Sequence, residues 1–341
     1  MDKIQVGLIG YGIAGSVFHA PLIRSVAGLE LAAVVTSRPV PIDDVRVVGA
    51  VEELLADPSI DVVVVATPTS THFEVATKAL HAGKHVVVDK PVVTSAHDAD
   101  VLIALAEERG RLLTVYQNRR FDGDFLTIKQ LLAAGELGNV AHYEAHYDRF
   151  RTKLTGVWRE QPLPGSGILY DLGAHLIDQC LVLFGRPRSV NGDVLMQREG
   201  AEAVDYFHLL LDYGFLRVIL HSSMIVPHPG PHFTIHGDGG SFFKFGMDPQ
   251  EAALKAGHMP GEPGWGVEAA ELFGELYSAD GSRRIVPTLT GGYENFYVGL
   301  AAAIRGDGPA PVDPRDSRDG LVVIEGALRS ASERRTVELE F

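Results

Sequence analysis

Apolar runs alternate with amphipathic stretches over the first part of the chain. The runs are rich in β-branched residues and predict strands at 4–9, 31–35, 62–66, 85–89 and 112–116. The stretches between them predict helices near 15–25, 51–56, 72–82 and 96–109. Strands of this kind that alternate with helices are typical of a parallel sheet covered on both faces. The pattern therefore predicts a doubly wound α/β domain over residues 1–119.

The pattern changes after Asn118. A helix is expected at 125–134, an alternating strand at 140–147, and a second helix that follows the glycine-rich segment 164–167 and ends near 184. The next apolar runs predict consecutive strands at 189–196, 203–213, 216–223, 232–236 and 242–245. Because no helix separates these strands, residues 120–341 are expected to form an α+β domain with an antiparallel or mixed sheet. The Gly- and Pro-rich residues 246–266 predict a long loop, and helices near 293–305 and 318–332 and a short strand are expected to end the chain.

The composition narrows the classes of protein to consider. The 341 residues suffice for two domains with sizeable cores, and no apolar run is long enough to span a bilayer. The net charge of −14 argues against broad binding to nucleic acid or to anionic membranes. The single cysteine, Cys180, excludes an intrachain disulfide and fits a reducing compartment. Since the N-terminal residues also lack the pattern of a signal peptide, a soluble cytoplasmic protein is expected.

The first predicted strand leads into a glycine-rich turn. Residues 10–15 read Gly-Tyr-Gly-Ile-Ala-Gly and connect that strand to the first predicted helix, which is the context that a dinucleotide-binding motif requires. In such a turn Gly10 permits the tight bend, Gly12 lets a pyrophosphate approach the backbone, and Gly15 lets the helix pack on the strand. The N–H groups and the positive end of the helix would face the phosphates. The alternative is a glycine turn without a ligand.

The end of the second predicted strand indicates which dinucleotide binds. An NAD site usually has Asp or Glu there, which accepts hydrogen bonds from the ribose hydroxyls. This chain has Thr36, Ser37 and Arg38 instead. Ser37 and Arg38 could donate to a 2′-phosphate, which a carboxylate would repel. The sequence therefore favours NADP over NAD, and the alternative for Arg38 is a solvated loop arginine.

Three further motifs accompany the glycine turn. Residues 66–72 read Ala-Thr-Pro-Thr-Ser-Thr-His and follow the third predicted strand, and Asp89-Lys90-Pro91 follows the fourth. Residues 167–175 read Gly-Ile-Leu-Tyr-Asp-Leu-Gly-Ala-His and open a helix of the second domain. Together these motifs extend over most of the chain and resemble the Gfo/Idh/MocA oxidoreductase family. The likeness is closest to a bacterial subgroup that includes NADP-dependent scyllo-inositol dehydrogenases, although the family's Glu-Lys-Pro motif has Asp89 as its acid here.

The resemblance implies a Rossmann domain followed by an open-faced, mostly antiparallel sheet that serves substrate binding and oligomerisation. Because an exposed sheet face would be a large apolar patch, a homodimer or homotetramer is expected. The resemblance assigns catalysis to Lys90, Asp171 and His175. The residues expected to bind the cofactor are Gly10, Tyr11, Gly12, Ile13, Ala14, Gly15, Ser37, Arg38, Thr67, Pro68, Thr69, His72, Asp89, Lys90 and Gln117.

The three catalytic residue types also fit hydride transfer on chemical grounds. Asp171 and His175 are four positions apart, so they share one face of a helix. An imidazole can accept the proton of a hydroxyl as hydride leaves the carbon. Lys90, at the carboxyl edge of the parallel sheet, could bind the reacting oxygen and stabilise alkoxide charge. The alternative for Asp171 and His175 is a hydrogen bond on a helix surface with no catalytic role.

The favoured function is thus an NAD(P)-dependent dehydrogenase or reductase of a cyclitol, sugar or related ketone, first of all of a scyllo-inositol or inosose. The alternatives are a dihydrodiol or small-carbonyl reductase and, in another class, a nucleotide-sensing protein without turnover. No metal is expected at His228, His232 and His236, because Pro227, Pro229 and Pro231 prevent a helix that would gather them and no cysteine lies near. Most of the arginines near the motifs are interpreted as solvated or as partners in salt bridges. These arginines are Arg119, Arg120, Arg149, Arg151 and Arg159.

Overall fold

The computed structural model describes residues 2–37 and 44–341, which form two compact units. The first unit runs to Phe121 and includes Gln250–Trp265 and Gly292–Arg318. The second unit comprises Asp122–Pro249, Gly266–Gly291 and Asp319–Phe341. The sequence predicted a boundary after residue 119 and one continuous second domain. The second unit is instead interrupted twice, because two of its expected segments pack with the first unit.

The first unit is built on six parallel strands in the order β3-β2-β1-β4-β5-β6. The strands are β1 (Ile4–Ile9), β2 (Leu29–Val35), β3 (Arg46–Val48), β4 (Val62–Val65), β5 (His85–Asp89) and β6 (Leu113–Tyr116). This is the strand order of a doubly wound dinucleotide-binding sheet. The predicted fold class is confirmed for this unit, and β3 is a strand that the apolar pattern did not predict.

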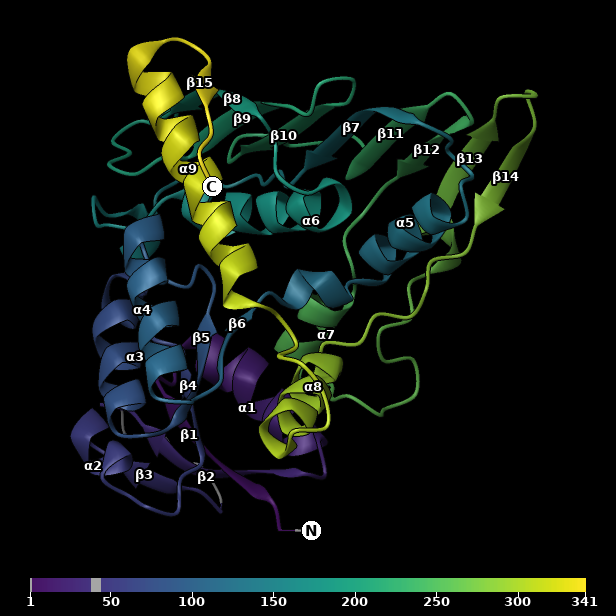
Figure 1. Cartoon of the computed structure of the whole chain (residues 1–341). Helices are drawn as coiled ribbons and strands as arrows, with labels where there is room; N and C mark the ends of the chain where they lie inside the picture. The colour runs from purple at the N-terminus through teal and green to yellow at the C-terminus, as the bar shows by residue number, and fades with distance from the viewer. Residues whose placement is uncertain (1, 38–43) are drawn as a thin grey trace. The chain divides into compact units, whose positions relative to one another are not determined.

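Helices cover both faces of this sheet. On one side lie α2 (Val51–Leu55), α3 (His72–His81) and α4 (Ala96–Glu108), and on the other lie α1 (Ala20–Ser25) and α8 (Glu294–Arg305), as Figure 1 shows. A π-helical turn, Ala14–His19, precedes α1. The unit also contains α7 (Gln250–Lys255), so the segment 246–266 is not the continuous loop that the sequence predicted.

The turn after β1 depends on two of its glycines. Gly10 has a φ of 98°, which residues with a side chain rarely adopt. A Cβ atom at Gly15 would lie 2.0 Å from the backbone oxygen of Gly10. At Gly12, by contrast, a Cβ atom would meet none of the described atoms within 4 Å. Gly10 and Gly15 are therefore required by the turn itself, whereas Gly12 borders open space.

The second unit is built on nine strands in the order β14-β13-β12-β11-β7-β10-β9-β8-β15. The strands are β7 (Val140–His146), β8 (Ser189–Leu195), β9 (Tyr206–Asp212), β10 (Arg217–Ser223), β11 (Phe233–Gly237), β12 (Gly240–Lys244), β13 (Gly274–Ser278), β14 (Arg283–Val286) and β15 (Val337–Glu338). Only β7 and β10 pair in parallel among the named strands, and the other neighbours are antiparallel. The mostly antiparallel sheet is confirmed, and β13 and β14 are additions to the predicted strands.

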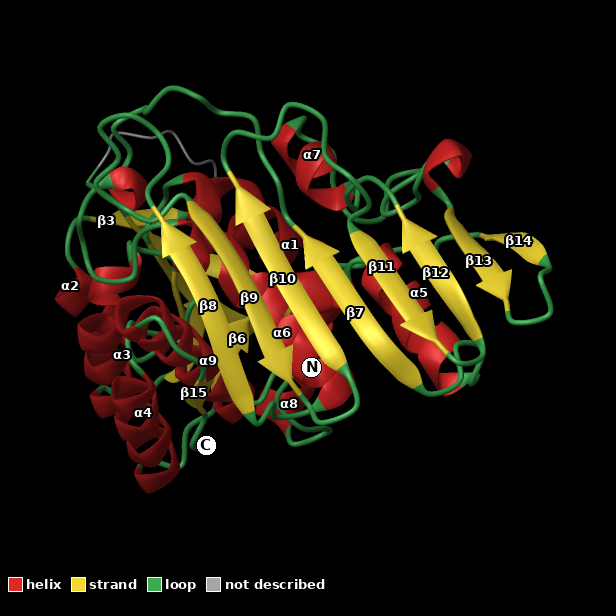
Figure 2. Cartoon of the chain, turned by 90° about the horizontal axis from the view of Figure 1, so that it is seen from above, coloured by secondary structure: helices red, strands yellow, loops and turns green. Residues whose placement is uncertain are grey.

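Helices cover one face of this sheet and leave the other open (Figure 2). The covering helices are α5 (Gly123–Ala133), α6 (Ala174–Phe184) and the part of α9 (Pro314–Glu333) that belongs to this unit. Alternate residues of β7, such as Tyr143 and Ala145, are fully buried beneath the helices. Of the helices described, none is both long enough and apolar enough to cross a bilayer.

The open face of the sheet is more polar than the sequence analysis expected. The residues of β7 between the buried ones are His142, Glu144 and His146, all partly exposed. Exposed apolar side chains, among them Leu210 and Leu195, lie on β9 and β8. The face is therefore a mixture of histidines, carboxylates and separate apolar groups, and the expectation of one large apolar patch was wrong.

We expect Gly15→Ala to lower the melting temperature of the protein and Gly12→Ala to leave it unchanged. The methyl group at position 15 collides with the Gly10 oxygen, which cannot move without opening the turn. Overpacking of this kind costs about 1–3 kcal/mol, which corresponds to a drop of a few degrees for a protein of this size. Thermal unfolding followed by circular dichroism measures both variants. Equal melting temperatures would contradict the geometry of the turn.

Candidate functional site

Most of the candidate cofactor residues of the first unit lie at one edge of its sheet. The glycine turn, Thr67–Thr69, Asp89 with Lys90, and Gln117 follow the carboxyl ends of β1, β4, β5 and β6. Because these strands are parallel neighbours, their carboxyl ends meet at the same edge. Open α/β sheets bind their ligands at this edge. The first unit therefore brings together residues that the sequence placed in four separate motifs.

The turn at residues 10–15 fits the phosphates of a dinucleotide. The backbone at Gly12 borders open space, Ile13 is exposed, and Tyr11 and Ala14 are partly exposed. The N–H of Ser16 donates to the Gly12 carbonyl at 2.9 Å and begins the helical segment. The N–H groups and the positive end of that segment are suited to hold an anion in this space. A side chain at position 12 would fill the space that a phosphate needs.

The two residues predicted to select the cofactor follow β2. Ser37 is exposed, two residues beyond the end of the strand at Val35. The N–H of Thr36 donates to the Val48 carbonyl at 3.3 Å, which ties the end of β2 to β3. Arg38 lies outside the described residues. Ser37 is thus accessible to a ligand at the carboxyl edge.

His72 joins two loops of this edge and is not exposed to a ligand. The side chain is buried, with Nδ1 3.0 Å from the Pro91 carbonyl and Nε2 2.9 Å from the Thr67 carbonyl. Burial lowers the pKa of His72, although Asp89 and the two carbonyls oppose this effect. The sequence analysis expected His72 to contact the cofactor. With both nitrogens occupied inside the protein, we assign it instead the role of holding the Thr67 segment beside Lys90–Pro91.

Asp89 lies beside a buried histidine that the sequence analysis missed. Its Oδ1 accepts a hydrogen bond from the Lys90 N–H at 2.8 Å and lies 4.0 Å from His19 Nε2. His19 Nδ1 lies 2.5 Å from the Tyr297 hydroxyl, and the His19 ring packs against Tyr116. Burial lowers the pKa of His19 more than Asp89 raises it, so the ring is neutral. A histidine within the apolar stretch of the first predicted helix was the signal that could have revealed it.

Gln117 and Arg119 are buried, and Arg120 beside them is partly exposed. Gln117 is buried, its Nε2 lies 3.4 Å from Ser317 Oγ, and its Oε1 has no hydrogen-bond partner among the residues described. In native proteins such an atom usually has a water or ligand as its partner. Arg119 and Arg120 form ion pairs with Glu251 and Asp316, which fits the structural role expected of them.

In the second unit, Asp171 and His175 lie on one continuous helical segment. A π-helical turn, Leu169–Gly173, leads directly into α6. Gly167 precedes it with a φ of 82°, and a Cβ atom there would lie 2.8 Å from the Val204 carbonyl. A Cβ atom at Gly173 would lie 3.3 Å from the Phe207 ring, so the segment packs closely on β9. The glycines of this motif are therefore explained by the packing of the helix that carries Asp171 and His175.

Asp171 and His175 have different surroundings. The Asp171 carboxylate forms an ion pair with Arg159, with Oδ1 3.2 Å from Nε, and both side chains are partly exposed. The guanidinium of Arg159 also lies 4.6 Å from the centre of the Trp158 ring. His175 is buried, and its ring stacks on Tyr147 at a centroid distance of 6.4 Å. Asp171 is thus an accessible acceptor paired with a guanidinium, and His175 is an imidazole oriented by aromatic packing.

A buried charge network holds the loop that carries Arg159. Arg198 Nη1 lies 2.9 Å from Glu160, and its Nε lies 2.8 Å from Asp205. The same guanidinium donates to the Arg151 carbonyl at 3.2 Å. The network therefore fixes Glu160, the neighbour of Arg159, and the start of the loop at Arg151. The sequence analysis missed Arg198, because no local spacing relates it to either carboxylate.

The three histidines considered as a metal set do not converge. His232 is buried, and its Nδ1 lies 3.0 Å from Asp124 Oδ2. His236 lies on the open face of the sheet, with its Nδ1 2.8 Å from Ser241 Oγ. His228 is exposed in the loop before β11. Each of the three thus has its own environment.

Comparisons with known proteins agree with this architecture. Residues 4–117 match the NAD-binding Rossmann fold of the Gfo/Idh/MocA oxidoreductase family, and residues 129–339 match the family's C-terminal alpha/beta domain. The chain is 43% identical over 347 residues to scyllo-inositol 2-dehydrogenase (NADP(+)) IolW of Bacillus subtilis (strain 168), covering 100% of this chain and 97% of the relative. It is 45% identical over 343 residues to the uncharacterized oxidoreductase YdgJ of Escherichia coli (strain K12), covering 98% and 99%.

Solved structures extend the likeness to the whole backbone. The structure of YvaA from Bacillus subtilis has a TM-score of 0.97 at 42% identity and covers 99% of each chain. An oxidoreductase from Bacillus cereus has a TM-score of 0.90 at 33% identity, again over 99% of each chain. With both of its domains matched by family descriptions and with full-length relatives above 40% identity, the chain belongs to the Gfo/Idh/MocA family of NAD(P)-binding oxidoreductases.

Proposed function

We propose that this protein is an NADP-dependent dehydrogenase that interconverts a cyclitol or sugar alcohol and its ketone, with a scyllo-inositol or inosose as substrate. The observation that carries the proposal is the full-length similarity to a relative named for that reaction and that cofactor. The presence of Lys90, Asp171 and His175 supports it, because these residues supply the groups that the reaction requires. A dihydrodiol or small-carbonyl reductase is the alternative, since one scaffold of this kind serves many substrates.

The residues of the chain bind the substrate and move its proton, while a bound nicotinamide supplies the carbon that accepts or donates hydride. In alcohol oxidation His175, oriented by Tyr147, takes the proton of the reacting hydroxyl, and in ketone reduction it returns that proton. Asp171 accepts a hydrogen bond from a substrate hydroxyl while Arg159 holds its carboxylate in position. Lys90 donates to the reacting oxygen and stabilises the alkoxide charge that develops there.

The preference for NADP rests on the residues after β2. Residues 36–38 contain no carboxylate to accept hydrogen bonds from an unmodified ribose. Ser37 and Arg38 are donors that suit a 2′-phosphate. The cofactor named for the Bacillus subtilis relative supports the same choice.

The proposal is tested by following the absorbance of the reduced cofactor with a panel of inososes, ketosugars and dihydrodiols. We expect turnover with an inosose and a higher kcat/KM for NADPH than for NADH. Arg38→Ala should reduce that preference by roughly 10- to 100-fold, the scale of one charge-assisted contact. Turnover of dihydrodiols or small carbonyls alone would favour the alternative substrate class, and equal use of both cofactors would contradict the role of Arg38.

His175→Ala and Lys90→Ala are each expected to lower kcat by roughly 10²–10⁴-fold, the usual contribution of a positioned proton-transfer group. His175→Ala should leave NADPH binding unchanged, because His175 belongs to the second unit. The double variant should lose less than the product of the two effects, since groups that act together are not additive. His97→Ala, on the exposed side of α4, is the matched control. Near-wild-type turnover in either single variant would remove that residue from the mechanism.

We also propose that a second copy of the chain covers the open face of the nine-stranded sheet. Leu210 and Leu195 are exposed there. A two-fold dimer through this face would bury both side chains of both protomers. Light scattering at micromolar concentration should therefore give the mass of a dimer or a tetramer. Leu210→Glu should shift the protein towards the monomer, while Val101→Glu, on the exposed face of α4, should not. A monomeric wild type would contradict the proposal.

A further inference from the structure

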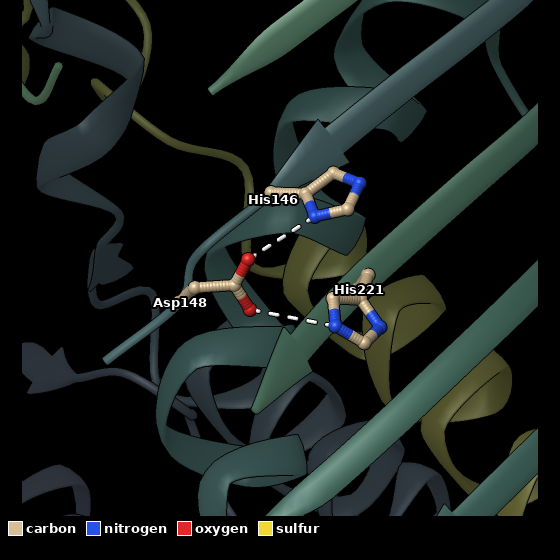
Figure 3. A group of neighbouring side chains, drawn as sticks. All are labelled: His146, Asp148 and His221. Atoms are coloured by element: carbon tan, nitrogen blue, oxygen red, sulfur yellow. Dashed lines mark hydrogen bonds and ion pairs between the residues drawn. The ribbon is translucent and has the colours of Figure 1, made fainter. Parts of the chain in front are cut away.

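Three side chains on the open face of the sheet converge on one point (Figure 3). His146 ends β7, and His221 is its direct neighbour in the parallel register with β10. Asp148 Oδ2 lies 3.2 Å from His146 Nδ1, and Asp148 Oδ1 lies 3.5 Å from His221 Nε2. One ligand atom from each residue lies within 4.8 Å of the other two. The Asp148 side chain is only 4% exposed, so its charge is held largely away from solvent.

A second carboxylate determines which nitrogen of His146 carries a proton. His146 Nε2 lies 2.7 Å from Glu144 Oε1, and an ionised carboxylate can only accept, so Nε2 is the donor. With Nε2 held by Glu144, the ring directs its other nitrogen, Nδ1, at Asp148 Oδ2. That arrangement requires a cation between them, either a second proton on the ring or a metal ion. A histidine that donates one N–H to a carboxylate and offers its other nitrogen to a metal is the usual arrangement at metal sites.

His221 and Asp148 are also held in position for coordination. His221 Nε2 faces the carboxylate of Asp148 at 3.5 Å, and a metal ion would bind this nitrogen in its unprotonated form. Within the described part of the chain, His221 Nδ1 has no hydrogen-bond partner. Asp148 Oδ1 accepts the N–H of Ser223 at 3.0 Å, which fixes the orientation of the carboxylate. His146 and His221 thus stand on paired strands, and Asp148 follows β7 by two residues and is tied to the end of β10 through Ser223.

We propose that His146, Asp148 and His221 bind one divalent transition-metal ion, with zinc as the ion best suited to two imidazoles and a carboxylate. In a tetrahedral zinc site with bonds of about 2.0–2.2 Å, ligand atoms lie roughly 3.3–3.5 Å apart. Each imidazole already lies at about this separation from one oxygen of Asp148, His146 Nδ1 3.2 Å from Oδ2 and His221 Nε2 3.5 Å from Oδ1. Three protein ligands leave the fourth position for water.

The position of this site gives it a structural role. Tyr147 lies between two of the ligands in the sequence, faces the opposite side of the strand, and stacks on His175. An ion that holds His146 and Asp148 therefore restrains the segment that orients His175. Hydride transfer itself needs no metal, so the ion takes no part in the reaction proposed above, and its binding can be tested without activity.

Titration of the metal-free wild type with Zn²⁺ by calorimetry at neutral pH is expected to show one ion bound per chain. Co²⁺ in place of zinc should give the visible absorption of a tetrahedral site. His221→Gln and His146→Gln should each weaken binding at least tenfold, and Glu144→Gln should weaken it by roughly 10- to 100-fold without changing the stoichiometry. The matched control is His236→Gln, which removes a histidine of the same face whose ring lies against Ser241.

Thermal unfolding provides a second readout that does not depend on activity. Zinc should raise the melting temperature of the wild type and of His236→Gln, but not that of His221→Gln. Circular dichroism of the metal-free variants establishes that each is folded before titration. The proposal is overturned if the wild type binds no stoichiometric zinc at micromolar concentration, or if His221→Gln and His146→Gln bind it as tightly as His236→Gln does.

Discussion

Two hydrogen bonds hold the backbone of Tyr147 against β10. Its N–H donates to the His221 carbonyl at 3.0 Å, and its carbonyl accepts from Ser222 Oγ at 2.6 Å. Because side chains alternate along a strand, this pairing places Tyr147 on the helix-covered face and His146 and Asp148 on the open one. A shift of one residue would exchange the two sets and remove the aromatic support of His175. The candidate chemistry of the second unit therefore depends on the register of β7 with β10.

In the first unit, the charge at the carboxyl edge of the sheet depends on two buried histidines near Asp89. His19 and His72 are buried at the carboxyl edge of the sheet, and burial lowers the pKa of each. The His19 ring therefore does not cancel the charge of Asp89, whereas the two ring nitrogens of His72 are held against the carbonyls of Pro91 and Thr67. Asp89 is oriented by the N–H of Lys90, so its negative charge stays next to the residue proposed to bind the reacting oxygen. The shorter acid in place of the family's glutamate is accommodated within this arrangement.

The sequence predicted those features that local pattern determines. The parallel sheet follows from apolar runs, and the glycine turns at Gly10 and Gly167 follow from backbone conformations that few residues adopt. Features that join distant positions were missed. The network of Arg198 with Glu160, and the approach of His221 to His146, depend on which strands become neighbours. The short β13 and β14 were missed for a related reason, because exposed edge strands such as β14 bury few of their residues.

The ion pair of Arg159 and Asp171 shows how such distant features serve the site. A partly exposed pair of this kind contributes only about 0–1 kcal/mol to stability, so stability alone does not account for the arrangement. Behind it, the buried Arg198 is paired with Glu160 and Asp205, and taking charges out of water is costly unless every partner is well placed. A rigid, buried network thus supports a weak pair at the surface. This combination is advantageous where the orientation of Asp171 matters more than the strength of its contact with Arg159. A carboxylate that accepts a hydrogen bond from a substrate hydroxyl is such a case.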